Sequence, residues 1–309
     1  MQAQTHLYRN DGTERSHRPS VGVFDSGYGG LSVLRAFRQA LPSVNFTYLG
    51  DSGRAPYGGR DLDTVLDFAE QCVERLFLEG CRVVVVACHT VSCVALRHLQ
   101  HRYGGADRRI LGVTIPAAEV AVSQTRGHIG LIGTIRTVAS HTFRTEVAKL
   151  DPAVKVSEVA APLLAPIVEE GWERTDLAHQ AVARYLALFG DIDTLVLGCT
   201  HYPLLRGAFE AGVKGNVKII DPAPFVATRF VDWLTRHPEF AVQSSGGIGT
   251  LRVLSSGDTA QFATHAERFL GETPPQVEHV AEEHGRLAFS QENAAPAGQF
   301  VRPRAERAR

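Results

Sequence analysis

Short apolar runs recur along the chain, and they constrain its fold more than any other feature. Each run is rich in Val, Ile and Leu and is too short for a helix that spans a domain. Continuous apolar runs of this length are typical of parallel strands that are covered on both faces. The runs that we predict as strands are 21–25, 44–50, 83–88, 110–114, 128–133, 194–199, 217–221 and 250–255.

A helical stretch separates two of these runs. Over residues 61–80 the apolar side chains recur at helical spacing, with Asp61 or Asp63 available as a cap and Gly80 available to end the helix. A helix between two strands is a crossover connection, and its repetition predicts an α/β fold with parallel sheets and right-handed crossovers. Ligands of such folds bind beyond the carboxyl ends of the strands.

Composition limits the class of protein. The chain has 309 residues, which suits two domains, and 44% of them are hydrophobic and 21% charged, as in ordinary globular proteins. A net charge of -1 gives no field that would attract a polyanion, so we expect no nucleic acid partner. No apolar run is long enough to cross a bilayer and the first residues are polar, so we expect a cytoplasmic protein without a membrane partner.

The two ends of the chain lack the strand and helix pattern. Residues 1–20 are polar and are expected to form a flexible leader. Residues 273–309 are rich in Pro, Ala, Glu and Arg, so we predict a largely flexible tail. Within that tail, the β-like stretch 277–280 is still able to dock on the folded part.

Two cysteines follow apolar runs directly. Cys88 ends the run 83–88 and Cys199 ends the run 194–199, so each thiol lies at the carboxyl end of a predicted strand. Packing alone explains either cysteine taken singly, and it explains the other three, Cys72, Cys81 and Cys93. The pair is different because each member is followed by hydroxyl and imidazole groups that can polarise a thiol. These groups are His89 and Thr90 after the first cysteine, and Thr200 and His201 after the second.

Two thiols that face each other across a carbon suit racemisation, which removes a proton from one face and returns one to the other. A thiol of ordinary pKa is only about 3% thiolate at pH 7, so charging one costs roughly 2 kcal/mol unless neighbours help. His201 and Asp25 are the candidate helpers. Five cysteines without a secretory segment also argue for reduced thiols.

A carbanion beside a carboxylate needs hydrogen-bond donors around that carboxylate. The stretch 25–30 follows the first predicted strand and offers three glycines and the hydroxyl of Ser26. Its spacing is not that of a dinucleotide-binding loop. The stretch 53–59 is a turn by composition, and it could hold a carboxylate through its amides and the phenol of Tyr57. A plain turn is the structural alternative for both stretches.

Three other functions compete with racemisation. Cys88, His89, Cys199 and His201 could ligate zinc, but adjacent Cys88 and His89 fit poorly the spacing of paired zinc ligands. A cysteine acyl-transfer enzyme would use Cys88 as nucleophile and His201 as base, which leaves Cys199 without a role. The third alternative is a regulator that binds an amino acid without turning it over.

At these residues the chain resembles the glutamate racemase family, within the aspartate/glutamate racemase superfamily. The matching stretches occur in family order over about residues 21–222, and they are VGVFDSGYGGLSVL, GDSGRAPYGGR, VVVVACHTVS, LIGT, PIVEEG and LGCTHYPLL. The resemblance implies two similar α/β domains, each a mostly parallel sheet flanked by helices, with the active site in the cleft between them and no cofactor or metal. The implied division is 21–113 plus 222–272 for the first domain and 114–221 for the second.

The resemblance also implies an activity, which is interconversion of L- and D-glutamate to supply D-glutamate for peptidoglycan. A different acidic substrate, such as aspartate, is the alternative. The family commonly forms dimers, so a homodimer is implied as well. By motif, the substrate-binding residues would be Asp25, Ser26, Tyr57, Gly58, His89, Thr90, Thr200 and His201. Cys88 would exchange the proton with the D-enantiomer and Cys199 with the L-enantiomer, assisted by His201, Asp25 and Glu169.

Two positions of the resemblance are open. Glu170 stands beside Glu169 and could be the matching carboxylate instead. The family motif reads Cys-Asn-Thr, whereas this chain has Cys88-His89-Thr90. A neutral imidazole donates at one nitrogen and accepts at the other, and it can gain a charge near pH 6.5, so His89 bears on substrate orientation and on the pH optimum.

Overall fold

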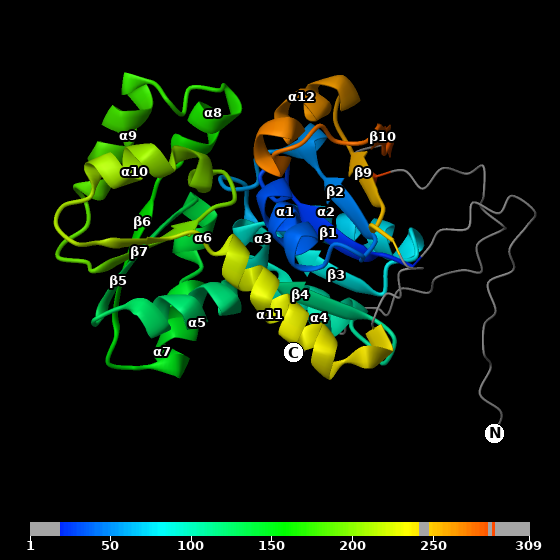
Figure 1. Ribbon diagram of the computed structural model, residues 1–309, viewed down its shortest axis with the longest axis horizontal. Helices are drawn as coiled ribbons and strands as arrows, with labels where there is room; N and C mark the ends of the chain where they lie inside the picture. Colours follow the sequence, from blue (N-terminus) through cyan, green and yellow to red (C-terminus); the bar gives the residue numbers. More distant parts are fainter. Residues whose placement is uncertain (1–18, 241–246, 284–285, 288–309) are drawn as a thin grey trace, which may run out of the picture.

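The computed structural model describes residues 19–240, 247–283 and 286–287 (Figure 1). Of the expected leader, only residues 19 and 20 belong to the described part. The expected tail is described over 273–283 and 286–287, and its remaining residues lie outside the description.

The first sheet has six strands in the order β10-β9-β2-β1-β3-β4, and every neighbouring pair is parallel. Its strands come from both ends of the described chain. They are β1 (Val21–Asp25), β2 (Phe46–Gly50), β3 (Val83–Val86), β4 (Arg109–Gly112), β9 (Leu251–Ser255) and β10 (Val277–His279). Strand β10 comes from the stretch 277–280, which therefore docks at the edge of this sheet.

The second sheet has four parallel strands in the order β6-β5-β7-β8. They are β5 (His128–Gly133), β6 (Lys155–Ala160), β7 (Thr194–Gly198) and β8 (Lys218–Ile220). A short antiparallel pair, β11 (Glu282–Glu283) and β12 (Arg286–Leu287), stands apart from both sheets. All eight predicted strands are present, but β6 was missed because it is an edge strand with Lys155, Ser157 and Glu158 among its residues, so it lacks a continuous apolar run.

The helix predicted over 61–80 is α2 (Leu62–Leu78). The Asp61 side chain accepts a hydrogen bond from the Thr64 amide at 2.8 Å, so Asp61 rather than Asp63 caps the helix. Gly80 follows the last turn with a φ of +85°, which glycine adopts without strain. The other helices are α1 (Leu31–Ala40), α3 (His89–Val94), α4 (Leu96–Tyr103), α5 (Thr114–Gln124), α6 (Ile135–Ala139), α7 (Thr142–Leu150), α8 (Leu164–Glu169), α9 (Asp176–Leu186), α10 (Arg206–Gly212), α11 (Ala223–Arg236) and α12 (Thr259–Leu270).

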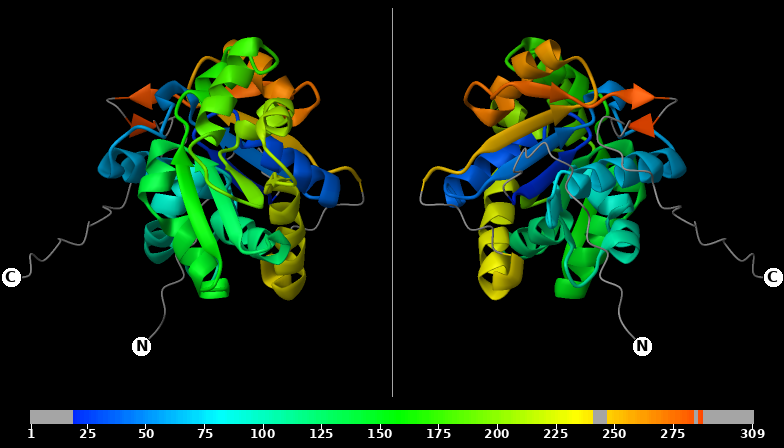
Figure 2. Two further views of the ribbon diagram at one scale, coloured as in Figure 1. Left: turned by 90° about the vertical axis from the view of Figure 1, so that its left-hand side faces the viewer. Right: turned by 90° about the vertical axis from the view of Figure 1, so that its right-hand side faces the viewer.

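Helices cover both faces of each sheet, as an α/β fold requires. In the first sheet, α1, α11 and α12 pack on one face and α2, α3 and α4 on the other. In the second sheet, α8, α9 and α10 pack on one face and α5 and α7 on the other. Helices α11 and α12 lie at opposite edges of the molecule in all views (Figures 1 and 2).

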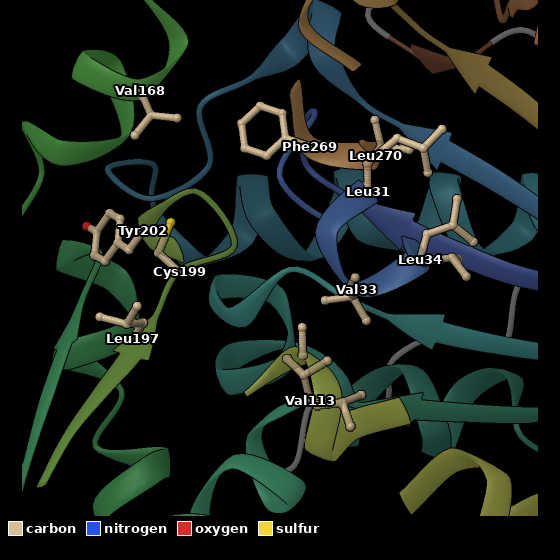
Figure 3. Close-up of a cluster of buried hydrophobic side chains, with 14 of the residues drawn as sticks. Leu31, Val33, Leu34, Val113, Val168, Leu197, Cys199, Tyr202, Phe269 and Leu270 are labelled. Atoms are coloured by element: carbon tan, nitrogen blue, oxygen red, sulfur yellow. The ribbon is translucent and has the colours of Figure 1, made fainter. Parts of the chain in front are cut away.

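One apolar cluster runs through both halves of the molecule. It contains Leu31 and Leu34 of α1 together with Leu197 of β7 and the neighbouring Tyr202 (Figure 3). The two sheets are therefore joined through one apolar core. The predicted fold class, two parallel sheets flanked by helices, is confirmed. The chain leaves the first sheet after β4 and returns to it in α11, and we propose domain boundaries at 113/114 and 221/222 on that basis.

Within the described residues, none of the helices is both long and apolar enough to cross a membrane.

Candidate active site

The carboxyl ends of strands from both sheets meet at one place. Strand β1 ends at Asp25, and the chain after β7 returns to it, because Thr200 Oγ1 donates a hydrogen bond to Asp25 Oδ1 at 3.4 Å. Gly29 also lies against Thr200. A Cβ atom at Gly29 would stand 2.2 Å from Thr200 Oγ1, so only glycine permits this approach. The loop after β1 and the loop after β7 therefore form one site.

Cys88 precedes α3 at the end of β3 and is only 5% exposed. Its Sγ lies 3.4 Å from Ser26 Oγ. Burial and the nearby Asp25 carboxylate raise the pKa of the Cys88 thiol to about 12, and the charge of Cys199 contributes in the same direction. Cys88 is therefore protonated at neutral pH.

Asp25 is fully buried between the two loops. Burial raises the pKa of Asp25, and this effect is opposed by the charge of His201 and by the Gly27 amide, which donates to Oδ2 at 3.0 Å. The charge of the Asp25 carboxylate thus acts on Cys88. The same carboxylate accepts a hydrogen bond from Thr200, the residue after Cys199.

Cys199 has a different environment. Its Sγ lies 3.8 Å from His201 Nδ1, and His201 Nε2 lies 2.9 Å from Glu169 Oε1. Burial lowers the pKa of His201, but hydrogen bonds to Cys199 and Glu169 outweigh burial and raise this pKa to about 10. His201 is therefore an imidazolium at neutral pH, and it lies against the Cys199 sulfur.

The choice between Glu169 and Glu170 is decided by geometry. Glu169 ends α8 and holds the His201 ring, whereas the adjacent Glu170 is exposed. Sequence alone could not separate the two, because adjacent residues on a helix point in different directions and only the packing of α8 selects one.

His89 is the first residue of α3 and is 6% exposed. It lines a small pocket together with Cys199, Thr200 and Asp221. Burial lowers the pKa of His89 to about 4, so the imidazole stays neutral near pH 7. The expectation that it gains a charge near pH 6.5 is therefore wrong, because that expectation used the pKa of a solvated ring.

Thr90 belongs to a cluster of three hydroxyls that sequence reasoning missed. Its Oγ1 lies 2.9 Å from Thr134 Oγ1 and 3.4 Å from Thr137 Oγ1, and Thr134 and Thr137 are 3.0 Å apart. Thr134 also caps α6. The stretch LIGT ends at Thr134 and was the only signal in the sequence. These hydroxyls link α3 of the first sheet to α6 of the second.

Tyr57 is placed differently from its prediction. The side chain is 1% exposed and its phenol donates to Asp51, which also binds Arg54. The phenol is therefore not available to a substrate, and only the backbone of this turn remains for that purpose. Gly58 packs against α6, because its carbonyl accepts from the Arg136 amide at 3.0 Å.

The remaining cysteines lie outside this site. Within the described ranges, no three His, Cys, Asp or Glu side chains form a group that could hold a metal ion. Cys72, Cys81 and Cys93 are buried free thiols, in keeping with a packing role.

A fold of two parallel sheets with paired thiols at their strand ends defines a class of proteins. The model of the family Asp/Glu/Hydantoin racemase matches residues 22–229, and the chain belongs to this family. The glutamate racemase of Roseobacter denitrificans is 37% identical over 264 residues, which is 81% of this chain and 96% of that protein.

Solved structures of glutamate racemases have a similar fold. The crystal structure of glutamate racemase isoform RacE1 from Bacillus anthracis has a TM-score of 0.79 and 33% identity, covering 87% of this chain and 99% of that chain. The glutamate racemase from Francisella tularensis in complex with D-glutamate has a TM-score of 0.79 and 26% identity, covering 85% and 98%.

Proposed function

We propose that this chain is a glutamate racemase that interconverts L- and D-glutamate with two thiols as acid and base. The observation that carries the proposal is that the loop after β1 contacts both cysteine segments, since Ser26 lies 3.4 Å from Cys88 Sγ and Asp25 accepts from Thr200, the residue after Cys199. Glutamate as the substrate is supported by the names of the relatives and by the D-glutamate bound in the Francisella tularensis structure.

The two thiols would share the work in each direction. For L-glutamate, the Cys199 thiolate beside His201 takes the α-proton, and the Cys88 thiol returns a proton on the opposite face to give D-glutamate. For D-glutamate the roles are exchanged: Asp25 takes the thiol proton of Cys88, the Cys88 thiolate removes the α-proton, and the Cys199 thiol returns a proton on the opposite face to give L-glutamate. One proton leaves and one arrives in each turnover, so no redox partner is required.

Substrate would lie where the two loops meet. We assign its carboxylates and ammonium to the hydroxyls of Ser26, Thr90 and Thr200, and to the backbone at Tyr57 and Gly58. His89 is a neutral donor or acceptor for the same substrate. Donors aimed at a carboxylate stabilise the carbanion that forms beside it.

The test is optical. Circular dichroism of purified protein with L- or D-glutamate should show loss of signal without added cofactor, and the α-proton should exchange in deuterium oxide. If aspartate is racemised and glutamate is inert, the substrate assignment fails while the thiol mechanism stands. If glutamate binds without any exchange, the chain is a binding regulator and the proposal is wrong.

The cellular role, the compartment and the oligomeric state that we propose rest on the resemblance to the glutamate racemase family. The D-glutamate supplies peptidoglycan synthesis, the protein works in the cytoplasm, and it forms a homodimer. Sedimentation velocity of the purified protein tests the last of these.

A further inference from the structure

Helix α12 of the first half of the molecule binds α8 of the second through one arginine. Arg268 Nη2 donates to the Val168 carbonyl at 2.8 Å and to Glu173 Oε2 at 2.6 Å, and its Nη1 reaches the Glu169 carbonyl at 3.4 Å. Both Arg268 and Glu173 are largely buried. The two helices lie side by side at one edge of the molecule (Figures 1 and 2). Arg268 therefore holds the last turn of α8, which carries Glu169.

The next residue of α12 reaches the other partner of Glu169. The Phe269 ring stands edge-on to the His201 ring, with centroids 5.3 Å apart and an interplanar angle of 75°. Phe269 extends from α12 toward the side that carries Val168 and Cys199 (Figure 3). Consecutive residues of one helix thus contact both members of the pair formed by Glu169 and His201.

We propose that Arg268 is a positioning residue for the reaction: by fixing the end of α8 it holds the Glu169 carboxylate against His201, and it thereby supports the Cys199 base. This inference rests on the proposed function. It assigns a part in the chemistry to a helix that follows the family match, which ends at residue 229.

The charge of Arg268 and its position predict opposite effects, which makes the proposal testable. The titratable and charged groups around His201 are Cys199 after β7, Glu169 on α8, Asp25 at the end of β1, and His265 and Arg268 on α12. A second cation near an imidazolium disfavours it, so removal of the arginine charge alone would raise the pKa of His201. Loss of the Glu169 contact would instead lower this pKa.

The experiment compares Arg268→Gln and Arg268→Lys with the unaltered chain. We measure kcat, KM and the pH profile of kcat/KM in both directions by circular dichroism. Arg268→Gln should lower kcat roughly 10- to 100-fold, because small misplacements of catalytic groups cost that much. The alkaline limb of the pH profile of kcat/KM should move to lower pH by roughly one unit, because the pKa of His201 falls. Arg268→Lys should recover part of kcat, since it keeps a donor near Glu173.

Arg229→Gln is the matched control. Arg229 joins α11 to α5 through Glu119 at 2.7 Å, away from both thiols, so its loss should leave kcat and the pH profile unchanged. Glu169→Gln should shift the alkaline limb in the same direction as Arg268→Gln, and the double variant should add little.

Three results would overturn the proposal. One is an unchanged pH limb in Arg268→Gln, with only a lower melting temperature, which would mean a structural role. The second is a limb that moves to higher pH, which would mean that only the charge matters. The third is additive losses in the double variant. Failure of the proposed function is a separate outcome, because it appears as absence of racemisation in the unaltered chain.

Discussion

The ends of strands β3 and β7 carry similar residues but differ in the charge of their histidines. Each has a cysteine, a threonine and a histidine within three residues. After β3, His89 is buried and its pKa is lowered to about 4, and Cys88 has a pKa raised to about 12. After β7, His201 has a pKa raised to about 10 and lies beside Cys199.

This difference teaches that the site is symmetric in its thiols and asymmetric in its electrostatics. At neutral pH the β3 end is a protonated thiol beside a neutral imidazole, and the β7 end is a sulfur beside an imidazolium. The resting protein thus holds a protonated thiol at Cys88 and a positive charge beside Cys199. The cause is the two partners of His201, since its ring lies 3.8 Å from Cys199 Sγ and 2.9 Å from Glu169 Oε1.

The strongest test removes either thiol. Cys88→Ser and Cys199→Ser should each lower racemisation by about 10²- to 10⁴-fold, because an alcohol is a far weaker acid and base in this role. Cys93→Ser is the control, since that thiol packs near Thr114 at 3.4 Å and has no assigned role. Circular dichroism of both glutamate enantiomers measures the rates. Near-normal racemisation by both site variants would refute the two-thiol mechanism.

His201→Asn tests the asymmetry itself. Loss of the imidazolium should lower kcat/KM roughly 10²-fold in both directions, because enantiomers have equal free energies and the two values of kcat/KM must stay equal. The asymmetry should appear in the isotope effects. With α-deuterated substrate, the isotope effect should rise for L-glutamate and fall for D-glutamate, since transfer at Cys199 becomes the slow step. Equal changes for both enantiomers would contradict the assignment of Cys199 to the L-enantiomer.

Tyr57→Phe tests whether the buried phenol of Tyr57 has a structural role. Asp51 would lose a buried hydrogen bond, so the free energy of unfolding should fall by about 1–3 kcal/mol. KM for glutamate should stay within about twofold, because the phenol faces Asp51 and not the substrate. Urea unfolding and steady-state rates measure the two effects, with Tyr103→Phe as a partly exposed control. A large rise in KM at unchanged stability would show that the phenol binds substrate.

His89→Asn gives the smallest expected effect. The pKa of His89 is about 4 in the folded protein and 6.5 in the unfolded chain, so the unfolded chain takes up the proton first as the pH falls. Stability associated with neutral His89 is therefore present above pH 6.5 and is lost between about pH 6.5 and 4. At pH 5 the variant should gain on the order of 1–2 kcal/mol relative to its difference at pH 8. A pH-independent difference in urea unfolding would mean that His89 is solvated.

Much of the fold could be predicted because strands that are buried on both faces need continuous apolar runs. The exceptions are edge elements. Strand β6 has one neighbour and polar residues such as Lys155, so its pattern is weak. Strand β10 has the same difficulty, and its sequence indicated only that it was able to dock.

The site could be predicted as far as its strand ends. Cys88 and Cys199 were evident because the chain itself brings each to the end of a run. Thr137 and Arg268 were not, since their partners lie far away in the sequence and no local pattern marks them, and Thr134 was marked only as the end of the stretch LIGT.

The sequence by itself determined the parallel sheets and the placement of a thiol after each of two strands, because these depend on the local order of residues. Only the tertiary structure decided the protonation states and the directions of side chains. A histidine is neutral at 89 and charged at 201 because burial governs the first ring, whereas the second is hydrogen-bonded to Cys199 and Glu169. Burial and through-space charge depend on the packing of distant segments, so they exist only once the two halves have come together.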